Sequence, residues 1–235
     1  MHARALTAEV VGTLFVHFVL FGMLLNFGSS TNVGALPAAV ATGLALMAAT
    51  TSLGHVSGGH FNPAITIGLI AGGRFDVAHA PGFIIAQIFG AVLAAAVYYI
   101  VISAGFLSSP ANAQLGTIAT ISNGFGAQGY QSLVAVLIFE SLAAALLVMI
   151  FMGATASRSL TPIAPLAIGA TLAGLYLILI PISGGGLNPA RSTATAVFAG
   201  AEALSQLWAF WIAPTIGAVA GGLVARFLLN EASEG

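Results

Sequence analysis

The stretch SGGHFNPA at residues 57–64 recurs as SGGGLNPA at residues 183–190. The two copies differ only at their fourth and fifth positions, and each interrupts an otherwise apolar part of the chain. Hydrophobic segments broken by Gly and Pro at matching positions in two halves are the best sequence indication of a transport site between repeats. The pair therefore predicts a membrane protein with an internal repeat.

The composition excludes a soluble domain. Of the 235 residues, 59% are hydrophobic and only 5% are charged, whereas about 25% is usual for charged residues in soluble domains. The long apolar runs exclude a membrane β-barrel, whose segments alternate over about ten residues. The net charge of −1 gives no electrostatic footprint for nucleic acid, and the chain has no cysteine for a disulfide framework. We expect a multi-pass helical protein whose partner is the lipid bilayer.

Six apolar segments are each close to the roughly 20 residues needed to cross a membrane. They are Leu6–Phe27, Ala35–Leu53, Pro81–Ile102, Leu133–Met152, Ile163–Ile182 and Gln206–Leu229. Two further segments, Asn62–Ala71 and Asn188–Ala199, are too short to cross. They predict re-entrant half-helices, because irregular backbone at membrane depth is tolerated only when it is buried in protein or lines a water-filled cavity.

Each half of the chain contains three spans, with one half-helix between its second and third spans. An odd number of spans inverts the second repeat relative to the first, so the half-helices enter from opposite faces. We expect a single channel domain over residues 1–235, with repeats at about 1–110 and 128–235. Four arginines, Arg4, Arg74, Arg158 and Arg226, fall on one side of this topology. The positive-inside rule then places both termini in the cytoplasm.

The two Asn-Pro-Ala triplets are Asn62, Pro63, Ala64 and Asn188, Pro189, Ala190. Asn is a strong N-cap and Pro favours the first helical position, so each triplet starts a helix. Two facing helix N-termini place partial positive charge at mid-membrane. The Asn amides donate hydrogen bonds, and the glycine-rich segments before them expose carbonyl acceptors. A single triplet would indicate only a helix start, but two in inverted halves predict a path for a small neutral molecule.

At this point the chain resembles the aquaporins, or major intrinsic proteins, over essentially its whole length. The residues that carry the resemblance are Ala8-Glu9, Gly12-Thr13, residues 54–64, Phe139-Glu140 and residues 188–192. The first Asn-Pro-Ala region is similar to that of bacterial water channels. The resemblance implies the aquaporin fold, an all-α membrane fold of six spans and two half-helices, in a bacterial inner membrane. It also implies a homotetramer with one pore per protomer.

The resemblance also implies a selectivity filter, which carries over by spacing to Thr42, Tyr176, Gly185 and Arg191. Water-selective members carry Phe, His and Cys or Thr at the first three positions, so this filter is expected to be widened, as in aquaglyceroporins. Arg191 should repel cations. The expected cargo is water with small neutral solutes such as glycerol, urea, metalloid hydroxides or arsenicals.

Other markers favour the alternative of a strictly water-selective channel. Glycerol facilitators carry Asp directly after the arginine and a basic residue four positions later, where this chain has Ser192 and Ala196. The Phe210-Trp211 pair also resembles water channels.

The intramembrane acids Glu9 and Glu140 occupy matching places in the two halves. Such residues are functional candidates, either as proton relays in an ion-coupled transporter or as scaffolds that accept hydrogen bonds from the re-entrant loops. Their symmetry and the resemblance favour the scaffold. His55 is expected to brace the first loop or to line the vestibule, and His17 to be a packing residue. Neither a metal site, a cofactor nor an enzyme mechanism is expected from the residues in the spans.

Overall fold

The computed structural model describes residues 3–27, 32–105, 116–126, 130–156 and 163–229, with the side chains of residues 32–34 excepted. Arg158, used above for orientation, lies outside the described residues. Among them, six long helices are apolar enough to cross a membrane. These are α1 (Ala3–Phe27), α2 (Asn32–Ser57), α4 (Ala80–Ser103), α5 (Leu133–Ala154), α6 (Ala164–Ser183) and α9 (Ala209–Leu229). Three shorter α-helices accompany them in the described chain: α3 (Pro63–Ala71), α7 (Pro189–Ala199) and α8 (Ala201–Gln206). Two short 3-10 helices, η1 (Val77–His79) and η3 (Ala119–Ile121), lie between the longer elements.

The predicted all-α fold of six spans and two half-helices is confirmed, with one correction at the last span. That span was expected over Gln206–Leu229, but Gln206 ends the separate helix α8 and α9 begins at Ala209. Gly200, whose φ is 103°, separates α8 from α7. The composition hides the break between α8 and α9, because these two helices together form one apolar stretch.

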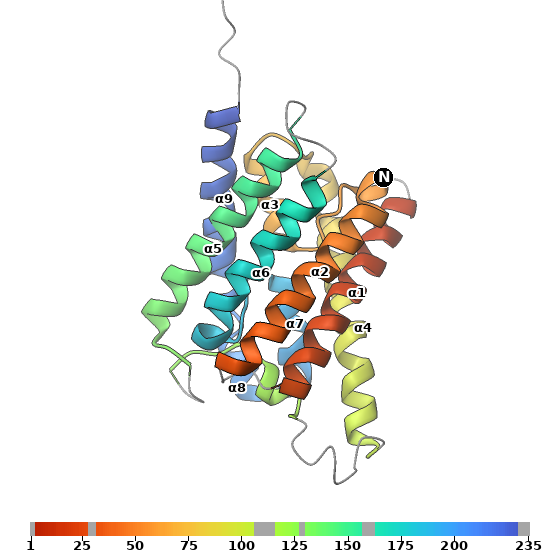
Figure 1. The fold of residues 1–235 in the computed structure, drawn as a ribbon, viewed down its shortest axis with the longest axis vertical. Coiled ribbons are helices and arrows are strands. Elements are labelled where there is room, and N and C mark those ends of the chain that lie inside the picture. The colour runs from red at the N-terminus through yellow and green to blue at the C-terminus, as the bar shows by residue number, and fades with distance from the viewer. Residues whose placement is uncertain (1–2, 28–31, 106–115, 127–129, 157–162, 230–235) are drawn as a thin grey trace, which may run out of the picture.

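The half-helices cross-link the two halves of the bundle. Helix α3 packs against α9, the last span of the second half, and α7 packs against α4, the last span of the first. Helices α2 and α6 make the other broad contact between halves. Figure 1 shows α1, α2, α5 and α6 side by side, with α3 near one end of the bundle and α7 and α8 toward the other.

Glycines allow the helices to approach at backbone distance. A Cβ at Gly217 would lie 1.8 Å from the Ser141 carbonyl oxygen, and one at Gly221 would lie 2.3 Å from that of Ala145. Gly217 and Gly221 therefore form an internal contact of α9 with α5. Close packing of this kind is how membrane helices gain van der Waals contact without a hydrophobic driving force.

Candidate channel site

The loops before the half-helices have the same unusual backbone. Phe61 and Leu187, each directly before an Asn-Pro-Ala asparagine, have positive φ angles of 49° and 56°. Non-glycine residues rarely adopt this conformation, and they keep it only when their surroundings impose it. The strain falls at equivalent positions in both repeats, and it turns the backbone immediately before each half-helix.

Glu9 holds the first loop. Its carboxylate accepts hydrogen bonds from the Ser57 hydroxyl at 2.6 Å and from the main-chain N–H groups of His60 and Phe61 at 3.1 and 2.8 Å. The Gln87 amide donates a further bond at 2.7 Å. Glu9 is fully buried, and a buried carboxylate is stable only when it is hydrogen-bonded in this way.

Glu140 holds the second loop in the same manner. It accepts from the Ser183 hydroxyl at 2.5 Å and from the N–H groups of Gly186 at 2.9 Å and Leu187. The contacts match those of Glu9 residue for residue along the repeat, apart from the bond that Gln87 adds. Both acids therefore make the contacts expected of loop scaffolds.

Asn62 and Asn188 begin α3 and α7. Their side-chain oxygens accept from the N–H groups of Ala64 at 2.8 Å and Ala190 at 3.0 Å, and Pro63 and Pro189 occupy the first helical positions. The amide nitrogens cross to the opposite loop. The triplets are thus placed together at the centre of the bundle, where two helix N-termini contribute partial positive charge.

A cavity of about 20 Å³ lies at this centre, which is enough for about one water molecule. Its polar lining comes from His17, His60, Asn62, Tyr176 and Asn188, and the rest is apolar. A narrow space with apolar walls and few polar groups suits molecules that pass in single file.

Arg191 is completely buried near the start of α7. Its guanidinium donates from Nη2 to the carbonyls of Ile121 at 2.7 Å and Gly184 at 2.8 Å, and from Nη1 to the Asn123 side chain. Asn123 was missed by the sequence analysis, because the segment that contains it has no pattern of its own. These bonds fix the orientation of a charge that is costly to bury without partners.

The other three residues of the expected filter are Thr42, Tyr176 and Gly185, and all three are buried. Of these, Tyr176 and Gly185 lie next to each other. Ring atoms of Tyr176 lie 3.1 and 3.2 Å from the point that a Cβ at Gly185 would occupy. Thr42 is buried and donates its hydroxyl to the carbonyl of Ala38, in its own helix, at 2.6 Å. The assignment of these four residues as the constriction stays a prediction.

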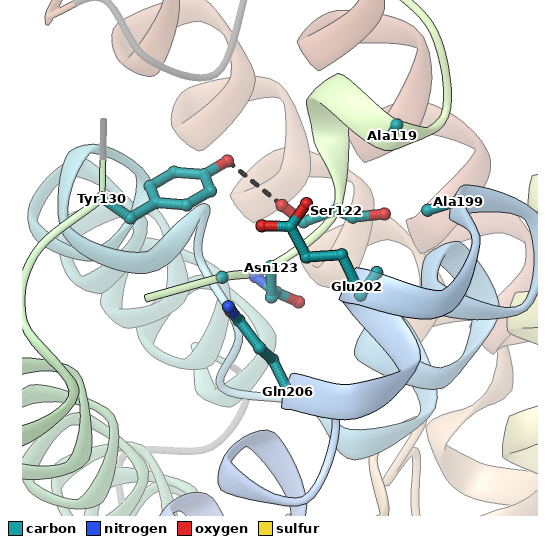
Figure 2. Close-up of a pocket in the computed structure, with 9 residues that line it drawn as sticks. Ala119, Ser122, Asn123, Tyr130, Ala199, Glu202 and Gln206 are labelled. Carbon is teal, nitrogen blue, oxygen red and sulfur yellow. Dashed lines mark hydrogen bonds between the residues drawn. The ribbon is translucent and has the colours of Figure 1, made fainter. Parts of the chain in front are cut away.

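A second cavity, of about 170 Å³, lies between residues 119–124, Tyr130, the end of α7 and α8. Asn123, Ser122, Tyr130, Glu202 and Gln206 line it, and Figure 2 shows the Tyr130 hydroxyl bonded to the Ser122 carbonyl. Asn123 is shared between this cavity and Arg191, so the cavity adjoins the buried guanidinium.

Two histidines near the first loop differ in their surroundings. His60 is buried, with Nδ1 3.1 Å from the Thr66 hydroxyl and its ring against Phe75 and Phe83. His55 is exposed, and its side chain makes no hydrogen bond within the described part of the chain. His55 thus lacks the contacts expected of a loop brace, and lining of the vestibule remains as its predicted role.

The two inverted half-helices meet at a narrow central cavity, and a buried acid holds the loop before each of them. This arrangement defines a membrane channel built from two repeats. The family model of the major intrinsic proteins matches residues 1–225, and the chain belongs to this family. It is a multi-pass membrane protein and a passive water channel, not an enzyme.

The chain is similar to aquaporin Z from three bacteria. It is 41% identical to that of Photorhabdus laumondii, with 97% of this chain and 98% of the relative covered. The identity is 38% with that of Rhodopseudomonas palustris, covering 98% and 95%, and 37% with that of Bradyrhizobium diazoefficiens, also covering 98% and 95%.

A solved structure, the aquaglyceroporin from Plasmodium falciparum, has the same fold. The TM-score is 0.77 and the identity 19%, over 99% of this chain and 97% of that one.

Proposed function

We propose that this channel passes water together with small neutral solutes, such as glycerol, urea, metalloid hydroxides or arsenicals, and excludes ions and protons. One observation carries the proposal of solute passage: Thr42 and Gly185, two of the four expected filter positions, contribute little or no side chain. The buried guanidinium of Arg191 and the two half-helix N-termini support the exclusion of cations and protons, since positive charge in such pores opposes their passage.

A strictly water-selective channel is the second candidate, and a specific contact favours it. The Tyr176 ring lies against the position where Gly185 has no side chain. The central cavity, at about 20 Å³, holds about one water molecule. The Tyr176 ring therefore takes up part of the room that glycine leaves.

Stopped-flow light scattering on proteoliposomes separates the two candidates. A sucrose jump measures water permeability by shrinkage, and a glycerol jump adds re-swelling if glycerol enters. We expect fast shrinkage and faster re-swelling than in empty liposomes, with urea and arsenite tested next. Fast shrinkage without faster re-swelling would establish the water-selective alternative. Thr42→Phe should reduce glycerol entry more than water flux, and unchanged glycerol entry would contradict the filter assignment.

An ion-coupled transporter is disfavoured by the contacts of the two buried acids. Glu9 and Glu140 each accept several hydrogen bonds from the loops, so both carboxylates are already engaged in holding the re-entrant backbone. Water and solute flux should therefore be independent of an imposed pH gradient across the liposome membrane.

We also propose that both termini lie in the cytoplasm of a bacterium, with the channel in the inner membrane as a homotetramer of single-domain protomers. The beginning of α1 and the C-terminal end of α9 lie at the same end of the bundle (Figure 1). Arg226, near the end of α9, has guanidinium atoms 3.8 Å from the point that a Cβ at Gly73 would occupy. Reporter fusions at each terminus test the topology. Light scattering of the purified protein, measured after chromatography, tests the tetramer that the family resemblance implies.

A further inference from the structure

His17 reaches the central cavity from α1 and contacts the second asparagine. Its Nδ1 lies 2.7 Å from the Thr13 carbonyl oxygen. A carbonyl can only accept, so Nδ1 carries the proton in the neutral ring and Nε2 is an acceptor. Nε2 lies 3.4 Å from the amide nitrogen of Asn188. The histidine is thus a cavity-lining acceptor and not only a packing residue.

This contact makes the two asparagines unequal. An amide has two N–H groups, and within the described chain the Asn62 amide donates only to the Leu187 carbonyl. The Asn188 amide donates to the Phe61 carbonyl and also faces His17. A passing molecule therefore meets a free N–H at Asn62, whereas the corresponding group of Asn188 is directed at the imidazole.

Phe21 lies one helical turn beyond His17 on α1 and is fully buried. Its ring centroid is 5.7 Å from that of His17 and 5.9 Å from Cζ of Arg191, which is within the roughly 6 Å range of a cation–π contact. Phe21 thus places an aromatic ring beside the guanidinium, although it is not one of the four expected filter positions.

The fold itself does not require this pair of rings. Glu9 and Glu140 are equivalent in the two repeats, and the positions eight and twelve residues after Glu140 are Val148 and Met152. Both are buried apolar residues of α5. Side chains of Val148 and Met152 pack against glycines of the first half-helix region. The repeat that carries Arg191 is faced instead by an imidazole and a phenyl ring.

We propose that His17 and Phe21 form a second selectivity element on α1, between Asn188 and Arg191. Phe21 narrows the space beside Arg191, where Thr42 and Gly185 are small, and so limits the width of a permeating solute. His17 accepts an Asn188 N–H through Nε2, so that N–H is not available to the permeating molecule. The proposal rests on the proposed function, because it names what sets the solute range of that same pore.

Thiol labelling tests whether α1 lines the pore. The chain has no cysteine, so Phe21→Cys and His17→Cys each introduce a single thiol. We expect a small methanethiosulfonate reagent to lower the water permeability of both variants several-fold, and a reducing agent to restore it. Phe15→Cys is the matched control, since Phe15 is on the same helix but 41% exposed on its outer face. Its permeability should not change.

Mass spectrometry after labelling shows whether each thiol has reacted, so a lack of effect on water flux can be assigned to an unreacted thiol or to a position outside the pore. Thiols at positions 17 and 21 that do not react, or that react without loss of water flux, would overturn the proposal. Because this readout is water permeability, it remains valid if the unmodified protein excludes glycerol. If the unmodified protein carries no water at all, the proposed function fails instead.

Permeability ratios then test selectivity. Phe21→Ala should raise the ratio of glycerol to water permeability several-fold, whereas Phe15→Ala should leave it unchanged. If Phe21→Ala does not fold, Phe21→Val provides a smaller opening for the same comparison. An unchanged ratio in a variant that still carries water would show that Phe21 is only a packing residue and contradict its role in selectivity.

Discussion

Asn62 and Asn188 each donate a hydrogen bond to the loop that carries the other. The Asn62 amide donates to the carbonyl of Leu187 at 3.1 Å, and the Asn188 amide donates to that of Phe61 at 3.0 Å. Each acceptor is the strained residue directly before the opposite asparagine. The side chain that begins one half-helix therefore also fixes the backbone before the other, so the two repeats stabilise each other at the centre of the membrane.

Substitution at Asn62 should separate the two roles of this side chain. Asn62→Asp keeps the capping oxygen for Ala64 but loses the donor to Leu187 and brings a carboxylate to the carbonyl. Asn62→Ala loses the cap as well, which costs about 1 kcal/mol. We expect both variants to lower the water permeability and the thermal stability in detergent, Asn62→Ala through the lost cap and donor and Asn62→Asp through the buried carboxylate. Asn62→Asp should also admit cations.

Asn26→Ala is the control for this pair, because Asn26 is an exposed asparagine of α1 that bonds the carbonyl of Gly22 in its own helix. Its permeability should equal that of the unmodified protein. Normal water flux and stability in Asn62→Asp would show that the cross-loop bond is dispensable.

Glu140→Gln tests the scaffold role of the buried acids. The carboxylate accepts three bonds, and one amide end of glutamine is a donor, so one loop donor loses its partner. Leaving a buried donor unpaired costs about 1–3 kcal/mol. We expect lower thermal stability or lower water flux, with no dependence of flux on a pH gradient before or after the substitution. A gradient-driven flux in the unmodified protein that Glu140→Gln abolishes would indicate a proton relay.

Much of this fold can be predicted from the sequence because its informative residues occur once in each half of the chain. The triplets at Asn62 and Asn188, and the acids Glu9 and Glu140, recur at matching places, so each copy supports the interpretation of the other. A chain with so few charged residues also leaves little choice of spans. The half-helices follow, since no other arrangement buries the broken apolar segments.

Contacts that lack a repeated partner could not be predicted. Asn123 reaches Arg191 from a segment without periodicity, and its role depends on tertiary placement alone. Gln87 is a lone amide in an apolar span, which signals a buried partner but does not identify Glu9. His17 was expected to pack, because sequence alone does not show which face of α1 meets Asn188. Helix α8 was missed because six residues give no periodic signal.

Gly217→Ala should disrupt the contact between α5 and α9. The added methyl group would meet the Ser141 carbonyl at 1.8 Å, and backbone cannot yield as a flexible side chain can. We expect a large fall in thermal stability and in the yield of folded protein from membranes. Gly153→Ala in α5 is the matched control, because nothing lies within 4 Å of its Cβ position, and its stability should be unchanged. Equal stability of both variants would mean that the helices can separate at little cost.

Asn123→Ala should loosen Arg191 without removing it. The Asn123 oxygen accepts from Arg191 Nη1 and from the Ser192 hydroxyl, and its amide donates to the Ser183 carbonyl. Without this oxygen, only the two bonds from Nη2 to carbonyls hold the guanidinium. Hydrogen bonds to charged groups contribute about 1.5–3 kcal/mol each. We therefore expect lower stability, together with higher permeability to glycerol and to cations relative to water.

Gln206→Ala distinguishes this effect from general damage to the loop. Gln206 lines the same cavity (Figure 2) and accepts from the N–H of Phe125 at 2.8 Å, but it is not a partner of Arg191. The substitution should lower stability while the permeability ratios stay unchanged. Asn123→Asp, which keeps an acceptor for the guanidinium, should restore the ratios toward those of the unmodified protein. If Asn123→Ala and Gln206→Ala change the ratios equally, the loop as a whole controls selectivity, and the bond from Arg191 to Asn123 has no separate part in it.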